Sequence, residues 1–139
     1  MAGKVLPEAF TCFTLNLDNL SELTKRFGYT VGDGVLKDFA GLVQLMGDTE
    51  GMRGYNGVGR FVVFFEECSS KKAAAMIRIL DNQVEEYNSL NPEYPIRYTA
   101  AWATTEETDT YEIRELLRLS QKKWKQMEKE KKDKAEEET

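Results

Sequence analysis

The sequence predicts an α+β fold in which helices pack on the faces of an antiparallel-centred sheet. Near the middle of the chain, residues 53–65 read RGYNGVGRFVVFF, and an Asn-Gly pair between two strand-like runs is typical of a β-hairpin. Helical patterns separate the other strand patterns, so the predicted order is β-α-α-β-β-α-β-α. Helices placed in this way bury their apolar faces against the sheet.

The first predicted elements are a strand and a short helix. Aromatic and β-branched residues alternate in FTCFTLNL, residues 10–17, which predicts a central strand. The helix that follows is expected to have Asp18 as its cap and Gly28 as its stop. Its apolar face consists of Leu20, Leu23 and Phe27.

A second helix is predicted to follow directly. Thr30 and Asp33 have the spacing of a capping box, and Gly47 stands at the stop position. The apolar stripe that should face the sheet consists of Val31, Val35, Phe39, Leu42, Val43 and Met46.

The central hairpin is expected to have a two-residue turn at Asn56-Gly57, which requires positive φ. In the run after the turn, apolar residues occupy both alternating sets, which predicts a strand buried on both faces. One set is Phe61, Val63 and Phe65, and the other is Val62 and Phe64.

The second half of the chain predicts a helix, a strand and a last helix. Residues 69–90 begin with serine and end before Asn91-Pro92, the signals of a helix start and stop. Residues 96–105, IRYTAAWATT, are typical of a strand. The apolar face of the helix over 69–90 consists of Ala73, Ile77, Leu80, Val84 and Tyr87.

The last helix is predicted to start at a capping box of Asp109 and Glu112. Its stripe consists of Ile113, Leu116, Leu117, Trp124 and Met127. Residues 129–139, KEKKDKAEEET, mix charges without an apolar stripe, so we expect a solvated end that frays.

Size and composition favour one domain, because a chain of 139 residues with 41% hydrophobic residues can bury a single core. The expected division is an N-terminal extension over residues 1–9, a domain over 10–132 and a charged tail over 133–139. A net charge of -5 argues against nucleic acid as a partner. No apolar run approaches the ~18 residues needed to span a bilayer, so no membrane is expected and the predicted location is the cytoplasm.

Histidine is absent, which excludes Ser-His and Cys-His nucleophiles and the usual zinc sites. Cys12 and Cys68 have no metal-ligand or disulfide spacing and are interpreted as small apolar residues.

Two stretches carry a family resemblance. NLDNLSELTKRFGYTVGD, residues 16–33, and YNGVGRFVV, residues 55–63, resemble the patterns D-x-D-x-F-K-x-I-N-D-x-x-G-H-x-x-G-D and R-Y-G-G-D-E-F-V-V of the GGDEF domain of bacterial diguanylate cyclases. The resemblance covers residues 10–132 and implies a nucleotidyl-cyclase-like fold with a ferredoxin-type sheet. It also implies the family reaction, in which two GTP molecules are joined into cyclic di-GMP across a dimer.

The chain departs from the family pattern at the positions of the metal-binding and signature acids. The resemblance places the two metal-ligand positions at Asn16 and Gly59, and Arg60 stands where the family has a further acid. A cation there would repel Mg²⁺ by about 4 kcal/mol per unit-charge pair at ~4 Å and an effective dielectric near 20. Since two-metal phosphoryl transfer depends on such ligands, we expect no catalytic residue, no metal, no cofactor and no enzyme activity. The degenerate signature is Gly57, Val58, Gly59, Arg60 and Phe61.

A remnant of nucleotide binding is a separate hypothesis. The resemblance places Thr24 and Asp33 at the guanine-reading positions and Lys131 near the phosphates. Each has a structural alternative, since Asp33 could complete the capping box and Lys131 could be a surface charge.

Three functions therefore compete. The leading one is a catalytically inactive regulatory or interaction module that works with other signalling domains or proteins, with a homodimer as one arrangement. The alternative is a nucleotide sensor that binds GTP weakly without hydrolysing it, and an active cyclase ranks last. If the resemblance were accidental, the chain would be a ferredoxin-like interaction domain.

Overall fold

The structure is a computed structural model that describes residues 9–46, 52–55, 59–108 and 112–137. The elements in these ranges follow the predicted order. They are β1 (Thr11–Leu17), α1 (Leu20–Phe27), α2 (Tyr29–Gln44), β2 (Met52–Tyr55), β3 (Arg60–Phe65), α3 (Ser70–Leu90), β4 (Tyr98–Thr104) and α4 (Ile113–Glu137).

The strands form one four-stranded sheet in the order β2-β3-β1-β4, with every neighbouring pair antiparallel. This confirms the predicted α+β class. β1 is central, and its Asn16 is paired with Arg60 on β3 and with Thr99 on β4. Because directly paired residues point to the same face, these three side chains lie in a row at one end of the sheet.

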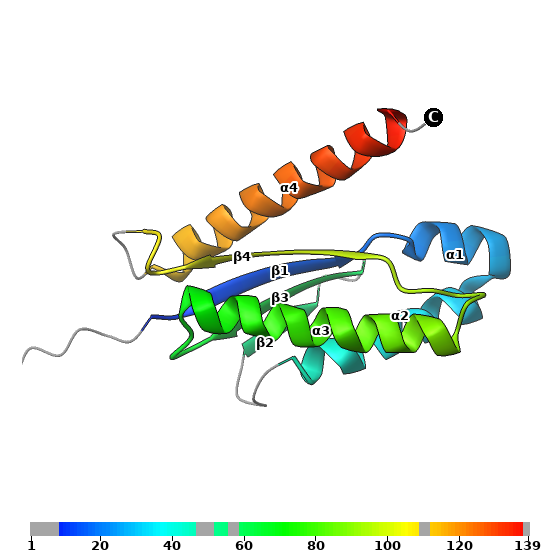
Figure 1. Ribbon diagram of the computed structural model, residues 1–139, viewed down its shortest axis with the longest axis horizontal. Helices are drawn as coiled ribbons and strands as arrows, with labels where there is room; N and C mark the ends of the chain where they lie inside the picture. Colours follow the sequence, from blue (N-terminus) through cyan, green and yellow to red (C-terminus); the bar gives the residue numbers. More distant parts are fainter. Residues whose placement is uncertain (1–8, 47–51, 56–58, 109–111, 138–139) are drawn as a thin grey trace, which may run out of the picture.

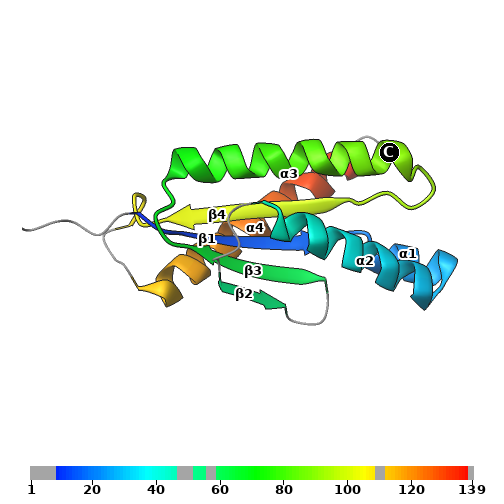
Figure 2. The same ribbon diagram turned by 90° about the horizontal axis from the view of Figure 1, so that it is seen from below.

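Helices cover both faces of the sheet: α2 and α3 lie on one side and α4 on the other (Figures 1 and 2). The larger core contains Phe13, Leu15 and Val63, and a smaller core under α4 contains Cys12 and Leu116. β3 was predicted to be buried on both faces, and this holds fully for one face only: Phe61, Val63 and Phe65 are buried in the larger core, whereas Val62 and Phe64 are partly buried against the smaller one. α1 lies beyond the end of β1 (Figure 1).

Two predicted helix caps are wrong. Asp18 does not cap α1, because its carboxylate accepts hydrogen bonds from Thr99 and Asn16 instead. The capping box of Thr30 and Asp33 is also wrong, since α2 begins at Tyr29 and both residues lie inside it. Gly28, with a φ of 94°, lets the chain leave α1 and enter α2 without a loop.

The start of α3 is confirmed. The Ser69 hydroxyl accepts a hydrogen bond from the Lys72 backbone N–H at 3.1 Å, as an N-cap should. Among the described helices, none has an apolar stretch long enough to cross a bilayer.

The hairpin is confirmed, but its predicted two-residue turn is wrong. Such a turn at Asn56-Gly57 would pair Tyr55 with Val58, whereas the strands pair Tyr55 with Phe61. The connection is therefore longer. Gly57 and its neighbours Asn56 and Val58 lie outside the described residues, as do the predicted stop Gly47 and cap Asp109.

α4 differs from its prediction in which residues form the buried face and in how far the helix extends. Leu116 and Trp124 are buried as predicted, but Ile113 and Met127 are exposed. The helix runs to Glu137, past the fraying expected from residue 129 and across the expected boundary at residue 132. Pairs such as Glu128 and Lys132, whose charged atoms are 3.4 Å apart, help to support it because they lie one turn apart.

Candidate functional site

The end of the sheet next to α1 brings together four polar residues, which we call the strand-end cluster: Asn16, Asp18, Thr99 and Lys131. Asn16 Nδ2 donates to Asp18 Oδ1 at 2.9 Å, and Thr99 Oγ1 donates to Asp18 Oδ2 at 2.5 Å. The ammonium group of Lys131 donates to Thr99 Oγ1 at 2.8 Å and lies 4.0 Å from Asp18 Oδ2. One carboxylate therefore faces one ammonium group.

Arg60 lies beside this cluster, on the neighbouring strand. Its guanidinium group lies 4.2 Å from the centroid of the Trp124 ring, a cation–π contact that joins β3 to α4. Arg60 Nε and Trp124 Nε1 are both buried without a hydrogen-bond partner. Sequence reasoning missed the contact of Arg60 with Trp124, which is 64 positions away (124 − 60).

Gly59 has a backbone role at the base of the hairpin. Its φ is 83°, a backbone conformation that residues other than glycine rarely adopt. Its carbonyl accepts the Leu17 N–H at 2.8 Å, and a Cβ atom here would lie 3.2 Å from Leu20 Cδ2. The position is packed against the start of α1.

Thr24 and Asp33 lie on α1 and α2 and are engaged locally. The Thr24 hydroxyl donates to the Leu20 carbonyl at 2.9 Å, and the Asp33 carboxylate pairs with Lys37 at 3.0 Å. Thr24 packs against α2 at Gly32, the residue before Asp33, since a Cβ atom on Gly32 would lie 2.4 Å from Thr24 Oγ1. Within the described part of the chain, no hydrogen bond or ion pair joins either residue to Lys131.

The residues present do not fit a divalent metal pair. The described residues contain no group of three or more Cys, Asp or Glu residues that could hold a metal ion, and the sequence has no histidine. Mg²⁺ in phosphoryl-transfer sites is usually bound through one or two carboxylates plus phosphates. At the strand end, Asp18 is the single carboxylate of the cluster, and it already lies beside Lys131.

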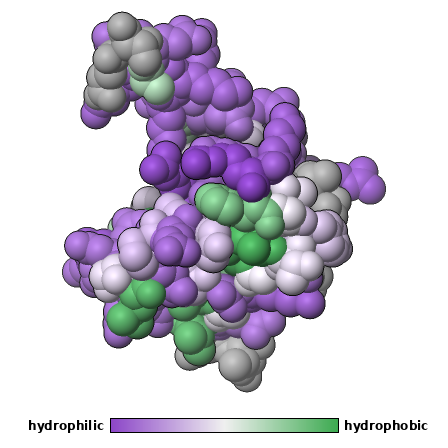
Figure 3. All heavy atoms as spheres, turned by 90° about the vertical axis from the view of Figure 1, so that its right-hand side faces the viewer, coloured by the Kyte–Doolittle hydropathy of each residue, from purple (hydrophilic) through white to green (hydrophobic). Residues whose placement is uncertain are grey.

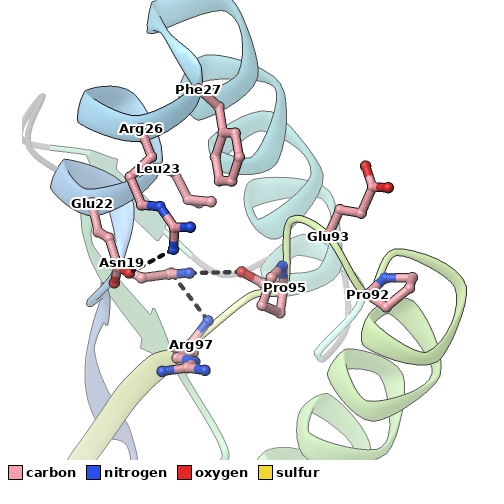
Figure 4. A pocket seen from close by; sticks show the side chains of 9 residues that line it. All are labelled: Asn19, Glu22, Leu23, Arg26, Phe27, Pro92, Glu93, Pro95 and Arg97. Carbon is pink, nitrogen blue, oxygen red and sulfur yellow. Dashed lines mark hydrogen bonds and ion pairs between the residues drawn. The ribbon is translucent and has the colours of Figure 1, made fainter.

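A hollow of about 200 Å³ lies beside α1, between this helix and the chain that leads into β4 (Figure 4). Asn19 is the residue that sequence reasoning missed here, since it reads as a helix-start residue. Its side chain donates to the Pro95 carbonyl at 2.7 Å and accepts from the Arg97 N–H at 3.2 Å. None of the predicted site residues lines the hollow, which is formed by Asn19, Glu22, Leu23, Arg26, Phe27, Pro92, Glu93, Pro95 and Arg97.

The surface at the α1 end of the molecule carries both apolar and polar side chains. Tyr29 and Leu90 are each 75% exposed and Phe27 is 39% exposed. Figure 3 shows the apolar side chains in separate groups among hydrophilic ones, with the hydrophilic end of α4 above them. Scattered apolar residues of this kind are normal on a protein surface.

The sheet order and the helices on both faces define an α+β domain of the nucleotidyl-cyclase type. A family profile described as "Diguanylate cyclase, GGDEF domain" matches residues 4–134. The chain therefore belongs to the GGDEF family, the diguanylate cyclase domains of cyclic di-GMP signalling.

Solved structures agree on the fold. The active GGEEF domain of a diguanylate cyclase from Vibrio cholerae is 19% identical with a TM-score of 0.78, and the match covers 88% of this chain and 78% of that one. An EAL/GGDEF domain protein from M. capsulatus is 14% identical with a TM-score of 0.71, covering 88% and 80%.

A third structure, a microbial GGDEF domain described in a novel interaction mode with cyclic di-GMP, is 23% identical with a TM-score of 0.66, covering 82% and 69%. At these identities the likeness extends to the fold alone. No curated protein matches the chain.

Proposed function

We propose that this chain is a catalytically inactive GGDEF domain that acts as a regulatory or protein-interaction module in bacterial signalling. The observation that carries the proposal is the composition of the strand end. Asn16 and Gly59 occupy the two positions where the family pattern has metal-binding acids, and Arg60 occupies a third acidic position. Phosphoryl transfer is almost entirely positioning and charge neutralisation, so a site without these acids has lost its main catalytic term.

The packing of these positions supports the proposal. Gly59 has a left-handed backbone and little room for a side chain. Arg60 lies against the indole of Trp124 and holds α4 to β3. Gly59 and Arg60 thus have structural roles that the acids of the family pattern would disturb at these two positions.

The partners we propose are other signalling domains or proteins, with a homodimer as one possible arrangement. A regulatory domain of this kind shifts the equilibrium between two conformational states of its partner, because it binds one of the two states more tightly than the other.

A nucleotide sensor that does not hydrolyse GTP is the second candidate. The observation in its favour is that α1 and α2 pack against each other with Thr24 next to Gly32, the residue that precedes Asp33. Against it, the Thr24 hydroxyl and the Asp33 carboxylate already have partners within their own helices. An active cyclase is the least supported reading.

The test of inactivity is a turnover assay. The purified protein is incubated with GTP and either Mg²⁺ or Mn²⁺, and the products are separated by chromatography. We expect no cyclic di-GMP above the level of a heat-treated sample. Product formed at a higher rate, and abolished by Asp18→Ala, would show that the domain is a cyclase with displaced ligands and would overturn the proposal.

A further inference from the structure

Lys131 approaches the strand-end cluster from α4, and its ammonium group is surrounded by oxygen atoms. It donates to the Tyr98 carbonyl at 2.9 Å and to Thr99 Oγ1 at 2.8 Å, and Asp18 Oδ2 is 4.0 Å away. An ammonium group has three donors and no acceptor. The oxygen set of a carbonyl, a hydroxyl and a carboxylate is therefore a cation site, and a side chain of the same molecule sits in it.

We propose that Lys131 is the resident cation of the strand-end cluster and that it excludes a metal ion from Asp18 while holding the second half of α4 on the sheet. The inference deepens the proposed loss of metal chemistry and rests on that proposal. It assigns to Lys131 a structural and electrostatic role in place of the phosphate contact that the family resemblance implied.

The charges at the strand end explain the exclusion. Asp18 is the carboxylate of the cluster, and the Lys131 charge lies within ion-pair distance of it. A divalent ion that approached Asp18 would be repelled by the Lys131 ammonium group and would have to displace it. The net attraction between the ion and the Asp18 carboxylate would be weak, because the site is half exposed to solvent. Thr99, which is 1% exposed, holds the arrangement together because its hydroxyl donates to Asp18 and accepts from Lys131.

The position of Lys131 on α4 explains the second role. Lys131 is seven residues after Trp124 (131 − 124), so both side chains leave the same face of the helix two turns apart. Trp124 contacts Arg60 on β3, and Lys131 contacts Thr99 on β4. The strand between them, β1, carries Asn16. Two contacts of different chemistry thus hold this part of α4 across three strands.

Binding at Asp18 and the position of α4 are coupled as a result. Any ligand that takes the oxygens of Asp18 and Thr99 displaces Lys131, and the second half of α4 then loses the hydrogen bonds of Lys131 to Tyr98 and Thr99 on β4. Lys131 can move in this way because its side chain is 55% exposed.

The first test measures Mn²⁺ binding by electron paramagnetic resonance in the full chain without nucleotide. Lys131→Met removes the charge and keeps a long side chain. Lys125→Met is the matched control, since Lys125 is an exposed cation of the same helix. We expect Lys131→Met to bind Mn²⁺ at least tenfold more tightly than the wild type and Lys125→Met, and to lose this gain when Asp18→Asn is added. Equal binding in all variants, or a gain that survives Asp18→Asn, would overturn the exclusion.

The second test measures amide hydrogen exchange along α4. In Lys131→Met we expect exchange after residue 124 to rise at least fivefold, with no change in Lys125→Met. Lys131→Arg keeps the charge and should retain the protection. Unchanged protection in Lys131→Met would refute the positioning role. Neither test uses GTP turnover. If cyclase activity overturned the proposed function, the Mn²⁺ binding and the hydrogen exchange would still test the role of Lys131 independently.

Discussion

Gly59 combines two constraints at a position where the family pattern has an acid. Its φ of 83° strains any other residue, and the space where a Cβ atom would stand lies 3.2 Å from Leu20 Cδ2. Restoring an acid here would therefore disturb the backbone before it could supply a metal ligand. Residue-level chemistry and local conformation are linked at this point of the chain.

We expect Gly59→Glu to lower the free energy of unfolding by about 1 to 3 kcal/mol, because it forces a side chain into a left-handed conformation. Gly34→Ala is the matched control. Gly34 is an exposed residue inside α2 with nothing within 4 Å of its would-be Cβ atom, so alanine should raise stability by about 0.5 to 1 kcal/mol. Urea unfolding measures both, and equal stability of the Gly59→Glu variant and the wild type would contradict the backbone role.

Cys12 is a second residue whose environment sets its chemistry. It is fully buried beneath α4, and burial raises the pKa of its thiol from 9.0 to about 11, while the hydrogen bond with Ser120 acts in the opposite direction. A thiol in this state is protonated at neutral pH and unreactive.

The raised pKa of Cys12 predicts a loss of stability at high pH. The unfolded chain releases this proton near pH 9 and the folded chain releases it near pH 11, so the stabilisation is complete below pH 9 and declines as the pH rises. By pH 10.5 the loss should reach about 2 kcal/mol. Unfolding free energies measured from pH 8 to 10.5 should fall more steeply for the wild type than for Cys12→Ala, and parallel curves would rule this contribution out.

At the scale of elements, the contact between α1 and α2 depends on a glycine. Gly32 is buried on α2, and a Cβ atom there would lie 2.4 Å from Thr24 Oγ1. The Thr24 hydroxyl is bonded to its own helix, which limits how far it can move. The two helices follow one another directly through Gly28, so a shift at this contact would move both.

We predict that Gly32→Ala destabilises the protein by about 1 to 3 kcal/mol through overpacking. Adding Thr24→Ala should restore part of this loss, because it removes the atom that the new methyl group meets. Gly41→Ala in the same helix is the control, since its would-be Cβ atom has nothing within 4 Å. Thermal unfolding of the wild type, Gly32→Ala, Thr24→Ala and the double variant gives the coupling, and strictly additive effects would mean that the clash is relieved elsewhere.

At the scale of the whole molecule, the net charge of -5 opposes a triphosphate. The three residues that the family resemblance places at nucleotide-binding positions lie in two parts of the molecule: Thr24 and Asp33 are on α1 and α2, and Lys131 is in the strand-end cluster. Two of them carry ion-pair partners, Lys37 for Asp33 and Asp18 for Lys131. Binding would have to break these contacts.

We therefore expect GTP to bind at best in the millimolar range, about 4 kcal/mol of binding free energy. Calorimetry with GTP and Mg²⁺ should show no saturation at low micromolar concentrations. A dissociation constant of a few micromolar that is lost in Asp33→Ala, without loss of the fold, would refute this expectation and favour the nucleotide sensor over the interaction module.

The sequence alone determined the order of the elements and much of their extent. Each of three signals lies within a few residues of the element that it predicts: the apolar run of β3, the serine before α3 and the glycine after α1. The strand, the helix start and the helix stop were all confirmed. The family was also readable, since its patterns in residues 16–33 and 55–63 are local.

Tertiary structure alone decided which partner each polar side chain takes. Asp18 reads as a helix cap, yet it bonds to Thr99, 81 positions away, and Asn19 bonds to Pro95, 76 positions away. In the sequence, Arg60 is a cation at a position where the family pattern has an acid. In the folded protein, α4 places the Trp124 ring against its guanidinium group. Short-range patterns cannot encode these choices, because a side chain with several local options takes the partner that the packed sheet and helices bring within hydrogen-bond distance and shield from water.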